Sequence, residues 1–141
     1  NINENISKDI NLNDEDILSC SPLVLAYIGD SVYELYIRSL LVSKNCRTTA
    51  HKLHLGSIKF VKAEAQSDFI HEIEDMLTPE EKNIVRRGRN AKSATVPKNA
   101  NISDYRYATG FEALLGYLYL KKRYFRLMEL LKMATNPKDN G

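Results

Sequence analysis

The sequence contains no run of about 18 consecutive apolar residues, which is the length that a helix needs to cross a bilayer, and no signal-peptide pattern at its start. It has only two cysteines, Cys20 and Cys46, and they form no C-x-x-C pair. We therefore expect free thiols and a cytoplasmic location, with a disulfide as the alternative. The three histidines and two cysteines match no zinc-binding pattern.

Charge is distributed unevenly, although the formal net charge is only +2. No acid occurs between Lys82 and Lys98, a segment that carries six Lys and Arg residues. The acids gather before residue 16 and between Asp68 and Glu81. Such an asymmetry is compatible with a polyanionic partner.

No segment alternates apolar and polar residues with a period of two, so we predict an all-α fold. Capping signals and helical periodicity predict helices over residues 22–42, 50–55, 59–77, 79–88, 105–122 and 123–134. Gly56 is expected to break one helix, and Ser103-Asp104 to cap another. With 141 residues, we expect a polar lead-in over 1–15, one domain over 16–136 and a tail over 137–141.

Two predicted helices are apolar enough to be buried, yet each carries acids. Asp30 and Glu34 are spaced one turn apart in the first, and Glu112 lies among apolar residues in the second. An unpaired buried carboxylate costs several kcal/mol or takes up a proton, and a divalent cation such as Mg²⁺ relieves that cost. Pairing with Arg or Lys of the protein is the alternative.

Five segments of the sequence resemble the ribonuclease III family. Residues 26–32 (AYIGDSV) resemble its signature, and residues 111–120 (FEALLGYLYL) resemble its second motif. The compact Mini-III branch in particular is similar over residues 88–93 (GRNAKS), 97–99 (PKN) and 105–107 (YRY). The resemblance extends from about Pro22 to Leu131.

The resemblance implies a helical, homodimeric catalytic domain without a double-stranded-RNA-binding domain. It implies a metal-dependent endoribonuclease that hydrolyses double-stranded RNA, leaves 5′-phosphate and 3′-hydroxyl ends, and processes large-subunit ribosomal RNA precursors. Asp30 and Glu112 would be catalytic ligands of Mg²⁺, or of Mn²⁺, with Glu34 as a further candidate ligand.

This sequence departs from the family pattern at three acidic positions. Ala26 and Leu23 stand where the family has Glu before the signature Asp, and Thr109 stands where it has Asp before the second-motif Glu. These departures leave open whether one or two metal ions bind.

The basic segment is the candidate surface for RNA phosphates and 2′-hydroxyls, which dominate recognition of A-form duplexes. The candidate RNA-binding residues are Arg86, Arg87, Arg89, Asn90, Lys92, Ser93, Lys98 and Asn99. A solvated loop is the alternative. Tyr33, Tyr36, Ile37 and Leu40 would form either a dimer seam or ordinary core.

Three other functions fit parts of the sequence. His51 and His54 could serve a metal-independent ribonuclease that uses the 2′-hydroxyl of its substrate. The chain could also bind double-stranded RNA or the ribosome without cleaving, because acidic positions are missing. A helical adaptor with no role on RNA is the third alternative.

Overall fold

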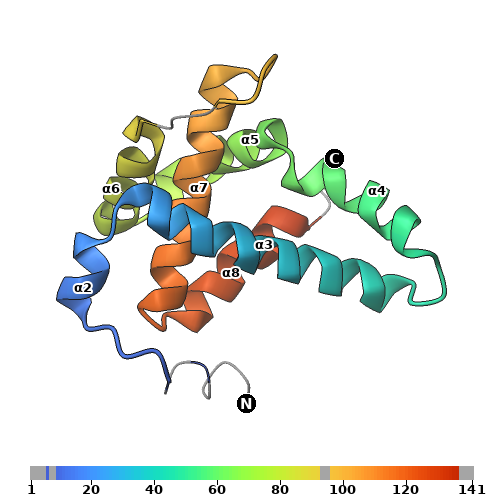
Figure 1. Cartoon of the computed structure of the whole chain (residues 1–141), viewed down its shortest axis with the longest axis horizontal. Helices are drawn as coiled ribbons and strands as arrows, with labels where there is room; N and C mark the ends of the chain where they lie inside the picture. The colour runs from blue at the N-terminus through green and yellow to red at the C-terminus, as the bar shows by residue number, and fades with distance from the viewer. Residues whose placement is uncertain (1–5, 7–8, 93–95, 137–141) are drawn as a thin grey trace.

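Every regular element among residues 6, 9–92 and 96–136, which the computed structural model describes, is a helix, so the predicted all-α fold is confirmed (Figure 1). The helices are α2 (Asp14–Ser19), α3 (Pro22–Lys44), α4 (Ala50–Val61), α5 (Ala63–Ile73), the 3-10 turn η1 (Glu74–Met76), α6 (Pro79–Asn90), α7 (Ile102–Leu120) and α8 (Tyr124–Thr135). None of the helices in the described ranges is long and apolar enough to span a membrane.

The predicted helix starts at Pro22 and Pro79 are confirmed, because each has the expected cap. The side chain of Ser21 accepts a hydrogen bond from the Val24 amide, and Thr78 forms a capping box with Glu81. A Pro at the first helical position needs no amide partner, which favours both starts. The predicted last helix is also observed, as α8.

Three predictions of local structure were wrong. Gly56 does not break a helix, since α4 continues through it to Val61 and the chain turns at Lys62 instead. A helix tolerates an interior Gly at a cost of about 1 kcal/mol. Asn101, rather than Ser103-Asp104, caps α7, because its side chain accepts a hydrogen bond from the Asp104 amide. The single helix predicted over residues 59–77 is divided at Lys62 into the end of α4 and α5, and it finishes as the 3-10 turn η1.

Helix α7 is the centre of the fold, with α3, α5, α6 and α8 packed around it (Figure 1). Its residues from Ala108 to Leu118, other than Glu112, are buried. A helix that is apolar on every side must be enclosed by neighbours. The Phe111 ring is fully buried and meets the rings of Tyr33 on α3 and Phe69 on α5 edge-to-face, at centroid distances of 5.2 and 5.4 Å. These contacts fix the rotation of α7 about its axis.

Of the four α3 residues that were expected to form either a dimer interface or ordinary core, two lie in the core. Tyr33 and Ile37 are 3% and 0% exposed and belong to the core of the single chain. Tyr36 and Leu40 are half-buried. The large apolar side chains that α3 does expose are Leu23, Val24, Tyr27, Leu35 and Val42.

Helix α4 projects away from the rest of the molecule. Together with the second half of α3 it forms an arm on the right of Figure 1, and Ser57 is the buried residue of this helix. The arm is defined here as residues 35–62.

Candidate active site

The carboxylates of Asp30 and Glu112 meet where α3 crosses α7, and two glycines allow that meeting. A Cβ on Gly29 would lie 1.7 Å from the carbonyl oxygen of Glu112, and a Cβ on Gly116 would lie 1.9 Å from that of Leu25. The two backbones are therefore in direct contact, which only residues without a side chain permit. The close crossing brings Asp30 and Glu112, each next to the contact, within hydrogen-bonding distance of each other.

The proximity of Asp30 and Glu112 places two like charges close together and changes the pKa of Glu112. Burial, the hydrogen bond with Asp30, and the charges of Asp30 and Glu34 raise the pKa of Glu112 to about 9. Asp30 is exposed and Glu112 is half-buried. Burial also raises the pKa of Tyr33, and the neighbouring Glu112 raises it further. Glu112 is thus held as a protonated acid near neutral pH unless a cation compensates its charge.

Glu34 lies one turn below Asp30 on α3, as its spacing predicted, and it faces a cation of the protein. Its carboxylate forms a salt bridge of 2.9 Å with Arg38, the next residue along the same row. Among the described residues, no group of three or more His, Cys, Asp or Glu side chains is arranged to hold a metal ion. The structure therefore brings together two of the three predicted ligands and engages the third elsewhere.

A pair of adjacent carboxylates, one of them with a raised pKa, suits a hard divalent cation. Mg²⁺ commonly takes one or two carboxylates from a protein and completes its shell with waters and substrate phosphate oxygens. No salt bridge from Asp30 or Glu112 to a cation of the protein is found in the described part of the chain. The chemistry of the pair fits Mg²⁺, with Asp30 and Glu112 as the residues that would hold it.

Two of the three acidic positions that this sequence lacks border a pocket at the start of α3 and α7. Leu23 and Thr109 both line a pocket of about 500 Å³ between the start of α3, the end of α6 and the start of α7. The Thr109 hydroxyl donates to the carbonyl of Tyr105 at 2.9 Å, and Ala26 is buried. None of these three side chains is a carboxylate, so Asp30 and Glu112 are the predicted acidic residues that the structure brings together here.

The basic segment begins on the last turns of α6. A second close contact between glycines packs these turns against α7. A Cβ on Gly88 would lie 2.8 Å from the Cα of Gly110, two residues before Glu112. Asn90 and Lys92 are exposed and line the same pocket as Thr109. The basic segment therefore reaches the pocket that Leu23 and Thr109 line.

The other predicted RNA-binding residues are placed differently. Arg86, Lys98 and Asn99 are exposed, and Asn99 has a φ of 71°, in the left-handed region that Asn tolerates. Arg87 donates to the Cys20 carbonyl at 3.4 Å. Arg89 is half-buried, donates to the Tyr107 hydroxyl at 3.1 Å and stacks on its ring. Ser93 lies outside the described residues.

Two further sets of basic residues were not predicted from the sequence to bind RNA. Arg106, exposed near the start of α7, lines the same pocket as Lys92. The arm contains no Asp or Glu, but it carries six Lys and Arg residues together with His51 and His54. The absence of acids, which drew attention to residues 82–98, could have identified it.

Comparison with known proteins agrees with the resemblance seen in the sequence. Residues 23–123 match the model of the Ribonuclease III domain. A Mini-ribonuclease 3 of Clostridium tetani is 54% identical over 122 residues, which cover 86% of this chain and 81% of the relative. One from Thermoanaerobacter is 53% identical over 124 residues, covering 88% and 87%.

A solved structure has a similar fold. The crystal structure of a protein from Fusobacterium nucleatum superposes with a TM-score of 0.75 at 30% sequence identity. The matched region covers 84% of this chain and 93% of that one. The helical arrangement around α7 is therefore shared with that protein.

Proposed function

This chain belongs to the ribonuclease III family, in its Mini-ribonuclease 3 branch, and is an endoribonuclease; from that premise we propose that it cleaves double-stranded RNA in a Mg²⁺-dependent reaction. The observation that carries the proposal is the contact between Asp30 and Glu112 at the glycine crossing of α3 and α7. Two carboxylates that repel each other, with no protein cation between them, are poised to accept a divalent metal.

The chain's own residues position the reaction. Asp30 and Glu112 hold the site at the surface of the α3–α7 crossing, where a phosphodiester can approach. A Mg²⁺ ion held by Asp30 and Glu112 would supply Lewis-acid chemistry, activating water for attack and stabilising the charge that develops on the leaving oxygen. Cleavage in this manner leaves a 5′-phosphate and a 3′-hydroxyl, which are the ends that we propose for the products.

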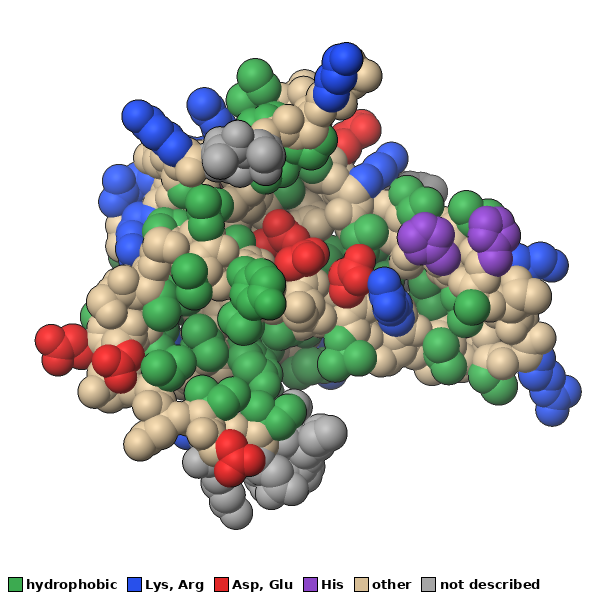
Figure 2. Space-filling view, viewed as in Figure 1, with side chains coloured by type: hydrophobic (Ala, Val, Ile, Leu, Met, Phe, Trp, Pro, Cys, Tyr) green, Lys and Arg blue, Asp and Glu red, His purple; other side chains and the backbone are tan. Residues whose placement is uncertain are grey.

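Duplex RNA is the proposed substrate because the basic surfaces beside the site suit a phosphate backbone. Figure 2 shows acidic side chains near the centre of one face, with Lys and Arg side chains at its upper left and right edges. Side chains cannot read the narrow major groove of A-form RNA, so contacts to phosphates and 2′-hydroxyls dominate. Lys92, Lys98, Asn99 and their neighbours are the residues that we assign to these contacts.

We also propose a homodimer, because a duplex presents two antiparallel strands and a two-fold dimer supplies one site for each. Exposed apolar side chains lie directly beside the acidic side chains in Figure 2. Tyr27 and Leu35, 76% and 69% exposed, lie two turns apart on α3 on either side of Asp30 in sequence. A dimer through this stripe would place two carboxylate pairs on one composite face.

The proposed natural substrate is a precursor of large-subunit ribosomal RNA, which the resemblance of residues 88–93, 97–99 and 105–107 to the Mini-III branch implies. The free thiols of Cys20 and Cys46 support action in a reducing compartment such as the cytoplasm.

The test is incubation of the protein with long duplex RNA, with and without Mg²⁺, followed by analysis of the product ends. We expect cleavage only with the metal, and 5′-phosphate and 3′-hydroxyl termini. Glu112→Gln keeps the size of the side chain but removes its charge, so it should abolish cleavage and spare binding. Glu15→Gln on the exposed first turn of α2 is the matched control and should cleave normally.

The alternatives give different results in the same experiment. Full activity in chelator with 2′,3′-cyclic phosphate ends would indicate the metal-independent reaction. Salt-dependent binding of duplex RNA without any cleavage would indicate a binding protein, and no affinity for duplex RNA would indicate an adaptor.

A further inference from the structure

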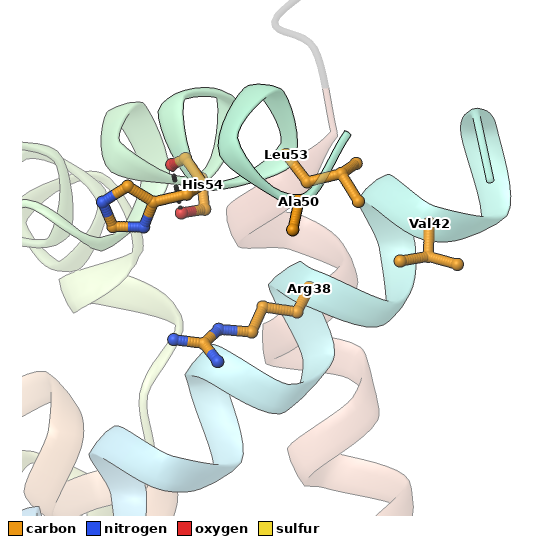
Figure 3. A pocket seen from close by; sticks show the side chains of 6 residues that line it. Arg38, Val42, Ala50, Leu53 and His54 are labelled. Atoms are coloured by element: carbon orange, nitrogen blue, oxygen red, sulfur yellow. Dashed lines mark hydrogen bonds between the residues drawn. The ribbon is translucent and has the colours of Figure 1, made fainter. Parts of the chain in front are cut away.

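A small pocket between α3 and α4 is lined by two side chains from different helices that can donate hydrogen bonds, Arg38 and His54. Its lining residues are Arg38, Val42, Ala50, Leu53, His54 and Ser57, and its volume is about 270 Å³. Figure 3 shows the Arg38 guanidinium and the His54 ring extending toward the same end of this pocket. The Ser57 hydroxyl is not available there, since it donates to the His54 carbonyl at 2.7 Å.

The pocket and the carboxylate pair are connected along α3. Asp30, Glu34 and Arg38 follow one another at intervals of one turn, so Arg38 lies about 12 Å along the helix axis from Asp30. The salt bridge of 2.9 Å from Glu34 holds one nitrogen of Arg38. A guanidinium has five N–H donors, so the remaining ones stay available to a second anion.

The surroundings of the pocket favour an anion. The arm that carries it has no Asp or Glu, and its six Lys and Arg residues are all exposed: Arg38, Lys44, Arg47, Lys52, Lys59 and Lys62. Glu34 is the acid that faces Arg38 from α3. A volume of about 270 Å³ is below the roughly 300–1000 Å³ of pockets that hold small organic ligands, which favours a single group such as a phosphate.

The arm and the basic segment of α6 lie on opposite sides of the carboxylate pair. In Figure 2 the acidic side chains occupy the middle of the face, with His, Lys and Arg side chains to the right and further Lys and Arg to the upper left. A duplex that spans the face would be contacted on both sides of the cleavage point. Contacts on both sides fix the register of the backbone over the site.

We propose that the Arg38–His54 pocket is a phosphate-binding subsite, in which the backbone of duplex RNA is held on the side of the carboxylates opposite the basic segment of α6. Arg38 donates to the phosphate while Glu34 orients it, and His54 donates from α4. The proposal rests on the proposed function, since the ligand is the same RNA. It adds a binding surface that the arm supplies.

The test measures affinity for a duplex RNA of about 30 base pairs in chelator, where no cleavage occurs, at several salt concentrations. We expect the double variant Arg38→Gln/His54→Gln to bind about three- to tenfold more weakly at 0.1 M salt. The plot of log K against log salt should also become less steep, by about 0.7–0.9 for each phosphate that the variant leaves without a cation. Lys92→Gln, in the other basic segment, should weaken binding comparably. Arg38→Lys keeps the charge and should recover most of the slope.

Lys122→Asn is the matched control for the removal of one charge. Lys122 is exposed at the turn after α7, ten residues beyond Glu112, and its φ of 60° suits Asn. Its removal should leave both affinity and salt slope nearly unchanged. Helical circular dichroism checks that each variant is folded.

A second pair of variants tests the pocket without touching Arg38. Val42 is 44% exposed at the pocket, so it accepts a polar side chain. Val42→Glu should weaken binding through repulsion of the phosphate, whereas Val42→Lys should bind as well as the parent protein or better.

The outcomes separate this proposal from the proposed function. Wild-type affinity and slope in the double variant, together with equal binding by Val42→Glu and Val42→Lys, would overturn the subsite and leave the nuclease assignment intact. A wild-type protein that neither binds nor cleaves duplex RNA would overturn both.

Discussion

Gly29 on α3 and Gly116 on α7 interlock, and each occupies the space that a side chain on the other helix would need. A Cβ on Gly29 would come within 2.9 Å of the Gly116 amide nitrogen, and a Cβ on Gly116 within 3.1 Å of the Gly29 nitrogen. The two carboxylates of the candidate active site lie close to these glycines in the sequence. Asp30 follows Gly29 directly, and Glu112 lies one turn before Gly116.

Replacing Gly29 with Ala should therefore damage both stability and activity. The added methyl would lie 1.7 Å from the Glu112 carbonyl, and backbone cannot move aside as a flexible side chain can. We expect Gly29→Ala to destabilise the fold by about 3 kcal/mol or more, as severe overpacking does, and to abolish cleavage. Urea denaturation and a cleavage assay measure the two effects.

Gly56→Ala is the control for that experiment. A Cβ on Gly56 would meet the Leu41 side chain at 3.7 Å, an ordinary contact, and Ala is the better helix former by about 1 kcal/mol. This variant should be at least as stable as the parent protein. Equal tolerance of the two substitutions would contradict the close crossing.

The contrast between these glycines also explains what the sequence could and could not predict. Glu112 could be singled out because a carboxylate among apolar residues is costly, whereas exposed Asp30 could be identified through the signature that residues 26–32 resemble. The crossing at Gly29 and Gly116 is a tertiary contact between distant helices, which local patterns do not encode. Gly56 was expected to end a helix because a glycine has the same local signature whether it breaks a helix or packs within one.

The arm was missed for a related reason. Its basic residues are spread over the end of α3, a turn and α4, and apolar residues separate them in sequence. The fold gathers Arg38 and His54 at one pocket although sixteen positions separate them. The segment after α6 was easier to recognise, because its Lys and Arg residues are close together in the chain.

In the absence of metal, the raised pKa of Glu112 should make the fold less stable as pH rises. A carboxyl whose pKa is raised from 4.5 to about 9 retains its proton in the folded state. Its contribution to stability is complete below the unfolded pKa and is lost as pH rises from there through the folded pKa. We expect a falling melting temperature between pH 5 and 9 in chelator, and Glu112→Gln should flatten this dependence.

Adding Mg²⁺ should reverse the effect in the parent protein. A ligand that binds only the folded state stabilises it, and at pH 8 we expect a rise of at least about 3 °C, corresponding to roughly 1 kcal/mol in a domain of this size. Glu112→Gln should respond much less. An equal rise in both proteins would place the metal elsewhere.

The buried pair of Glu81 and Arg126 should dominate stability at the low end of the pH range. Glu81 is 2% exposed and receives two hydrogen bonds from Arg126, at 2.9 and 2.8 Å. Burial works to raise the pKa of Glu81, but the hydrogen bonds from Arg126 and the Thr78 backbone outweigh it and hold the pKa below its ordinary value. The stabilisation is therefore present above the unfolded pKa and is lost as pH falls through the folded pKa.

Arg126→Met should destabilise the protein by about 3 kcal/mol at pH 7, since it leaves a buried carboxylate unpaired. The difference from the parent should shrink as pH falls, because protonation of Glu81 removes the charge that Arg126 compensates. Arg123→Met is the matched control, because the Arg123–Glu80 pair is 41% and 45% exposed. Removal of such an exposed pair should cost less than about 1 kcal/mol. Denaturant titrations at pH 7 and pH 3.5 distinguish the two variants.

The exposed stripe of Tyr27 and Leu35 on α3 should determine the oligomeric state. Leu35 is 69% exposed and borders an apolar groove of about 540 Å³ between α3 and α8, so a second copy of the chain is the partner that covers it in the proposed dimer. Leu35→Arg places a charge in that contact without disturbing the core of the single chain. We expect it to sediment as a monomer, whereas the parent protein sediments as a dimer.

The dimer also has a consequence for cleavage, which separates it from a fortuitous association. A monomer retains Asp30 and Glu112 but offers one site to a duplex with two strands, so Leu35→Arg should cut duplex RNA far more slowly. Leu55→Arg, at a 54% exposed position on the arm, adds the same charge away from the stripe and should remain dimeric and active. A monomeric parent protein with full activity on both strands would contradict the dimer, and a dimeric Leu35→Arg would move its interface to another surface.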